Sequence, residues 1–86
     1  MKILLLVLFF FFSGHAFANP SVSARLQSIY LNQQGVALLK MEKPELALQK
    51  FSEALAEDPD SATLHLNMGL AFEALGDSEK AMQAYK

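Results

Sequence analysis

The 86-residue sequence contains no cysteine. Disulfide bonds, thiolate metal sites and cysteine nucleophiles are therefore excluded, and so is a lipid anchor on an N-terminal cysteine. A glycine-rich phosphate-binding loop is also missing, because the four glycines are scattered along the chain. A domain of this size without disulfides must be held together by packing or by neighbouring units.

Basic residues are few as well. Between residues 19 and 86, five Lys and one Arg stand against six Glu and three Asp, which gives a formal charge of 6 − 9 = −3. Nucleic-acid phosphates are bound by clustered Lys and Arg side chains. The acidic balance therefore argues against a nucleic-acid partner.

The longest apolar run lies at the N-terminus. Lys2 is followed by ten apolar residues at positions 3–12, and residues 16–18 read Ala-Phe-Ala. A basic start, a short apolar run and small residues two positions apart are typical of a secretory signal peptide. We predict a signal peptide over residues 1–18, cleaved after Ala18, and a periplasmic or secreted product. The alternative is a retained membrane anchor, although ten helical residues span only about 15 Å of a roughly 30 Å hydrocarbon core.

The rest of the chain repeats itself with a period of 34 residues. Residues 28–52 and 62–86 are identical at five positions, and most of the remaining apolar positions also correspond. The identical pairs are Gly35/Gly69, Ala37/Ala71, Glu45/Glu79, Ala47/Ala81 and Gln49/Gln83. A period of this length indicates units that pack on one another to form a shared core.

Apolar spacing predicts two helices in each unit. The predicted stripes of the first unit are Leu31, Gly35, Leu38, Leu39 and then Ala47, Phe51, Ala54, Leu55. The second unit has Leu64, Met68, Ala71, Phe72 and Leu75, followed by a helix that runs towards Lys86. We therefore predict an all-α fold. Residues 19–27 extend the first helix backwards, residues 28–61 form the first repeat, and residues 62–86 form an incomplete second repeat.

Turn residues support these helix boundaries. Pro44 suits the first turn of the second helix. Asp60 or Ser61 is predicted to cap the third helix, and Asp77 or Ser78 the fourth. Gly76 is predicted to end the third helix in a left-handed conformation.

The repeated units resemble the tetratricopeptide repeat, with a resemblance that covers residues 28–86. The matching residues are Gly35, Leu38, Ala47, Phe51, Ala54 and Pro59 in the first unit and Gly69, Phe72, Gly76, Ala81 and Tyr85 in the second. Leu31 and His65 replace a usual aromatic residue, and Gln34 replaces a usual leucine, which predicts a looser first helix pair. The resemblance implies antiparallel helix pairs stacked as a right-handed solenoid.

The resemblance also implies a concave groove, lined by the first helix of each pair, for a peptide or a partner protein. The groove residues that it implies are Ile29, Asn32, Gln33, Val36, Lys40, Thr63, Leu66, Asn67, Leu70 and Glu73. In peptide-binding members, an asparagine at the position of Asn67 bonds the ligand backbone; the alternative is a solvated amide. The clamp that grips a C-terminal carboxylate in some members is not expected, because Val36 and Asn32 replace its amide and its lysine.

Enzymatic features are weak. His65 is the one histidine after the predicted cleavage site, and its place between two leucines predicts a packed, hydrogen-bonded ring. The acidic residues Glu42, Glu45, Glu53, Glu57 and Asp58 fall near helix ends or on hydrated stripes. We expect no catalytic residues, no metal, no cofactor and no small-molecule substrate.

The C-terminal apolar positions Ala81, Ala84 and Tyr85 have no following helix to cover them in this sequence. We expect either a fragment of a longer repeat protein or an end that pairs with a second copy or a partner. The leading functional prediction is a non-catalytic adaptor of the bacterial envelope. The alternatives are a self-associating structural protein and the regulatory front of a longer enzyme.

Overall fold

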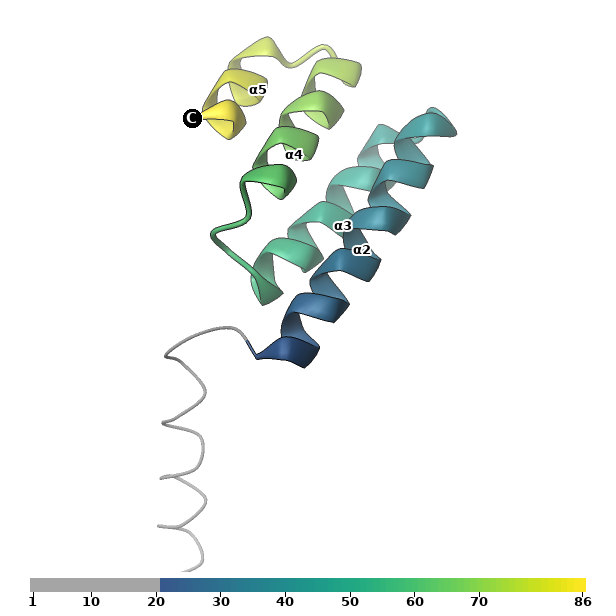
Figure 1. The fold of residues 1–86 in the computed structure, drawn as a ribbon. Coiled ribbons are helices and arrows are strands. Elements are labelled where there is room, and N and C mark those ends of the chain that lie inside the picture. The colour runs from purple at the N-terminus through teal and green to yellow at the C-terminus, as the bar shows by residue number, and fades with distance from the viewer. Residues whose placement is uncertain (1–20) are drawn as a thin grey trace, which may run out of the picture.

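The computed structural model describes residues 21–86, so the predicted signal peptide and its cleavage site lie outside the described residues. The described chain is all-helical, with α2 (Val22–Lys40), α3 (Pro44–Glu57), α4 (Ala62–Ala74) and α5 (Ser78–Tyr85). Among residues 21–86 there is no strand. Helices α2 and α3 form a first hairpin, α4 and α5 form a second, and α4 lies against the first hairpin (Figure 1).

Side-chain caps and a proline start the helices as the sequence predicts. The Ser61 hydroxyl accepts a hydrogen bond from the Leu64 amide (3.3 Å) at the start of α4. The Asp77 carboxylate accepts one from the Lys80 amide (3.1 Å) at the start of α5. Pro44 occupies the first turn of α3, where its missing N–H removes no helical hydrogen bond.

The turns that end α2 and α4 have the same hydrogen bonds, displaced by 34 residues. Gly76 has φ +79° and donates to the carbonyl of Glu73, and the next amide donates to the carbonyl of Phe72. Glu42 has φ +60° and donates to the carbonyl of Leu39 in the same way. Glycine adopts this left-handed region readily, whereas a side chain is disfavoured there. The left-handed end at Gly76 is confirmed, and Glu42 repeats it without a glycine.

The core lies between the first hairpin and α4. Its buried members are Leu31, Ala47, Phe51, Ala54, Leu64 and Ala71. Phe51 is fully buried, and a Cβ atom on Gly35 would overlap its ring. Small residues thus let α2 and α3 approach closely, while one aromatic ring fills the space between them.

The predicted looseness of the first hairpin is wrong. Gln34 is only half-buried, so it does not interrupt the contact between Gly35 and the enclosed ring of Phe51. The Ser28 hydroxyl, itself buried, also donates a hydrogen bond to the carbonyl of Ala54 (3.1 Å). This bond ties the N-terminal half of α2 to the C-terminal end of α3.

The second hairpin repeats the contact in a more open form. A Cβ atom on Gly69 would overlap the ring of Tyr85, the residue 34 positions after Phe51. Ala81 is buried, like its counterpart Ala47, but Tyr85 remains 41% exposed. Phe72 is half-buried and Pro59 is exposed in the loop before α4. The same seam is therefore closed in one hairpin and partly open in the other.

Candidate peptide-binding surface

Helices α2 and α4 are joined by an amide pair. The Asn67 side-chain nitrogen donates a hydrogen bond to the side-chain oxygen of Asn32 (2.7 Å), although the two residues are 35 positions apart. Both side chains are partly buried, so the bond is partly shielded from competing water. The pair fixes α4 against α2 and brings the candidate residues of the two helices onto one surface.

The ten candidate groove residues come equally from α2 and α4. Asn32, Val36 and Asn67 are half-buried, and Val36 also packs against the core. The others are exposed: Ile29, Gln33, Lys40, Thr63, Leu66, Leu70 and Glu73. We call these ten residues the amide surface, after the asparagine pair that joins its two helices.

The chemistry of the amide surface is apolar and amide-rich. Ile29, Leu66 and Leu70 are 54%, 51% and 44% exposed, which leaves large hydrocarbon side chains in water. The two charged members, Lys40 and Glu73, have opposite signs. A surface of this kind favours apolar side chains and backbone groups over a charged ligand.

Glu73 has a partner of its own within the second hairpin. Its carboxylate accepts a hydrogen bond from the Tyr85 hydroxyl (2.8 Å). Partial desolvation raises the pKa of Tyr85, and the hydrogen bond to Glu73 and its negative charge raise it further. The Glu73 side chain is therefore held towards α5.

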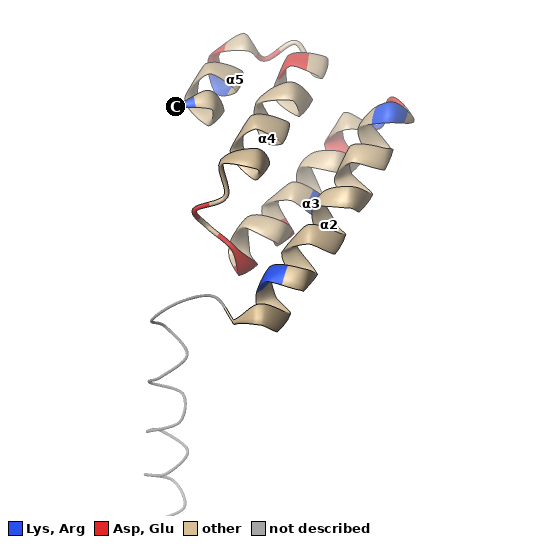
Figure 2. Ribbon diagram, in the orientation of Figure 1, with Lys and Arg blue, Asp and Glu red and all other residues tan. Residues whose placement is uncertain are grey.

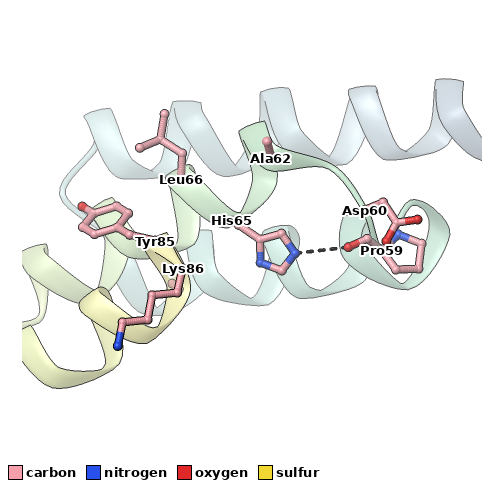
Figure 3. A pocket seen from close by; sticks show the side chains of 8 residues that line it. Pro59, Asp60, Ala62, His65, Leu66, Tyr85 and Lys86 are labelled. Atoms are coloured by element: carbon pink, nitrogen blue, oxygen red, sulfur yellow. Dashed lines mark hydrogen bonds between the residues drawn. The ribbon is translucent and has the colours of Figure 1, made fainter.

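An open recess of about 640 Å³ lies where α4 and α5 meet the loop before α4 (Figure 3). It is lined by Pro59, Asp60, Ala62, His65, Leu66, Ala84, Tyr85 and Lys86. Its counterparts in the first hairpin include Leu31 and Phe51, which are buried in the core that α4 shares. The recess thus corresponds to the place where a further helix would pack.

The prediction of a packed His65 ring is wrong. The residue is exposed, and its Nε2 atom shares a hydrogen bond with the carbonyl of Pro59 (3.1 Å; Figure 3). Its counterpart Leu31 is buried because α4 packs over the first hairpin, and no described helix packs over the second in the same way. The predicted hydrogen bond is present, but the predicted burial is not.

Sequence reasoning did not anticipate two surface features. It placed Asn32 and Asn67 in one groove without predicting the bond between them, which depends on how α2 and α4 pack. It also treated residues 21–27 only as a helical extension, although Val22 and Leu26 are 76% and 62% exposed. Their four-residue spacing, on a helix with no acidic residue, was the available signal.

The remaining polar chemistry of the described region is that of a hydrated surface. Its ion pairs are Lys50–Glu53 (3.5 Å) and Lys80–Asp77 (3.9 Å), both within one helical turn. Residues 21–86 contain no group of three or more His, Asp or Glu residues placed to hold a metal ion. In that same part of the chain, no helix combines the length and the hydropathy needed to span a bilayer.

Comparisons with known proteins agree with the geometry. The family profile described as tetratricopeptide repeat matches residues 32–86. Over 51 residues the chain is 41% identical to the TPR repeat-containing protein YsoA of Bacillus subtilis, a stretch that covers 59% of this chain and 15% of YsoA. The chain thus corresponds to a small part of that relative's length. No solved structure matches the chain significantly.

Proposed function

Because the chain belongs to the tetratricopeptide repeat family, we propose that it is a non-catalytic protein-interaction scaffold of the bacterial envelope. Repeats of this family generally mediate binding between proteins. In this proposal a peptide or a segment of a partner protein lies on the amide surface. The envelope location rests on the signal-like pattern of residues 1–18.

The observation that carries the proposal is the bond between Asn32 and Asn67. An amide side chain has two N–H donors and an oxygen with two lone pairs, so one shared bond leaves donors and acceptors on both residues. Leu66 and Leu70 stand exposed beside the pair on α4. Amides bordered by hydrocarbon suit a peptide, whose backbone bonds the amides while its apolar side chains cover the leucines.

The experiment is a quantitative pull-down from envelope extract with the full chain and two matched variants. Leu70→Lys places a charge on the amide surface at a residue that is 44% exposed. Leu46→Lys places the same charge on α3, outside that surface, at a residue that is 48% exposed. We expect Leu70→Lys and Asn67→Ala to lose a protein that the unmodified chain and Leu46→Lys both capture. Equal capture by all four chains would overturn the assignment of the amide surface.

Self-association through the recess between α4 and α5 is the alternative proposal. It is supported by the exposure of Met82 (62%) and Tyr85 (41%) at that end of the structure. Analytical ultracentrifugation over a concentration series separates the two proposals. A dimer that Met82→Lys dissociates supports self-association, whereas a monomer at all concentrations supports the scaffold.

A further inference from the structure

The first helix is longer than its repeat requires. Helix α4 begins at Ala62, whose counterpart in the first unit is Ser28, whereas α2 begins six residues earlier at Val22. Six helical residues add about 9 Å to α2. Within residues 22–27 only Ala24 is even half-buried, so these turns add nothing to the enclosed core.

The extension nevertheless carries large apolar side chains in water. Val22, Leu26 and Ile29 are 76%, 62% and 54% exposed, and their spacing of four and three residues puts them on one face of α2. Tyr30, 56% exposed, borders the same face. We call these four residues the α2 tip. Exposed hydrocarbon gathered on one face is typical of a surface that meets a partner.

Charge separates α2 from the rest of the described chain. Residues 21–41 contain Arg25 and Lys40 but no acidic residue, for a net charge of +2. Residues 42–86 contain nine acidic residues and four lysines, for a net charge of 4 − 9 = −5. Figure 2 shows basic positions near both ends of α2, while the acidic positions lie beyond its C-terminal end.

We propose that the α2 tip rests on the surface of a lipid bilayer that contains anionic lipids. Apolar side chains on one helix face, with a basic residue beside them and no acidic residue, match the chemistry of a helix that lies in the headgroup region. A tyrosine at the edge of the face suits this region, because its ring is apolar and its hydroxyl is polar.

The sequence before α2 favours lipid over a protein partner. The apolar run of residues 3–12 ends eight residues before the helix cap Ser21. Eight extended residues reach at most about 28 Å. A chain whose apolar run enters a bilayer therefore keeps the α2 tip close to that bilayer's surface. This inference goes beyond the scaffold proposal, because it uses the N-terminal end of α2 and no residue of α4.

The absence of tryptophan makes a direct test possible. Single-tryptophan variants of the full chain are mixed with phosphatidylcholine–phosphatidylglycerol vesicles that contain brominated lipids, which quench tryptophan on contact. Leu26→Trp places the probe on the α2 tip, and Gln27→Trp places it one residue later, about 100° away round the helix axis. Met82→Trp is the distant control, since Met82 is 62% exposed, like Leu26.

We expect the probe at position 26 to lose most of its emission and to shift to the blue, while the probes at 27 and 82 change little. The quenching should weaken in vesicles of phosphatidylcholine alone, because Arg25 then lacks an anionic partner. Equal quenching at all positions, or none at position 26 with vesicle-bound protein, overturns the proposal. Shielding of position 26 by added envelope proteins but not by vesicles also overturns it, in favour of a protein partner. Circular dichroism of each variant checks that the helices are retained.

Discussion

The ring that packs on a helix glycine is Phe51 in the first hairpin and Tyr85 in the second. Phe51 is completely enclosed because α4 covers the first hairpin, whereas Tyr85 is 41% exposed at the open recess. Its hydroxyl makes this exposure tolerable, since it bonds the carboxylate of Glu73. One repeat pattern thus gives a closed seam and an open seam, and neighbouring helices decide which.

Removing the two rings should produce the largest difference between the hairpins. Phe51→Ala is expected to lower the free energy of unfolding by about 3–5 kcal/mol, because it leaves a cavity in an enclosed core. Tyr85→Ala should cost distinctly less, since water already reaches that ring. Urea unfolding followed by circular dichroism measures both losses. Equal losses would mean that the second seam is as closed in solution as the first.

Adding a methyl group to the two glycines tests the same contrast from the opposite side. Gly35→Ala pushes against the enclosed Phe51 ring and should destabilise the fold by about 1–3 kcal/mol. Gly69→Ala pushes against Tyr85, which has solvent to turn into. Its clash is offset by the roughly 0.5–1 kcal/mol that alanine gains over glycine within a helix. Thermal melts of both variants should therefore rank Gly69→Ala well above Gly35→Ala.

The turns that end α2 and α4 offer a smaller test in which the first hairpin is the weaker one. Glu42 adopts a left-handed conformation that glycine adopts freely, so Glu42→Gly should stabilise the protein by about 1 kcal/mol. Gly76→Ala should destabilise it by about 1 kcal/mol through the backbone alone, since a Cβ atom there has no neighbour within 4 Å. Chemical denaturation resolves both signs. A destabilised Glu42→Gly variant would contradict this account.

The smallest effect concerns pH. The pKa of Tyr85 is raised above its usual 10.0 by partial desolvation and by the bond to Glu73, so folding favours the protonated hydroxyl. The associated stability is fully present below about pH 10 and is lost as the pH rises through the folded pKa. Tyr85→Phe should lack this loss, and the difference between its unfolding midpoint and that of the unmodified chain should shrink above pH 10. A difference that stays constant across this range would exclude the contribution.

Much of the fold was predictable because it depends on local sequence. The 34-residue period, the apolar stripes and the cap Ser61 each involve residues within one helix or turn. The end of α2 was also within reach, since a shift of 34 residues from Gly76 points directly to Glu42. Local geometry of this kind repeats whenever the sequence repeats.

The errors came from contacts between helices. His65 was expected to be packed because its neighbours are leucines, yet its burial depends on a helix that would lie over α4. Gln34 was expected to loosen the first hairpin, but the closeness of α2 and α3 is set by Gly35 and Phe51. The bond between Asn32 and Asn67 likewise required the relative placement of two helices. Composition and spacing within one helix carry no record of these distances.

The bond between Asn32 and Asn67 has a consequence for binding entropy. An amide side chain that is free in solvent loses rotamer freedom when it grips a ligand, at a cost of about 0.5–1.5 kcal/mol for each side chain immobilised. In this protein the two amides already restrain one another before any ligand arrives. Folding has absorbed part of that loss, so a weakly bonding peptide backbone meets two groups that are already oriented.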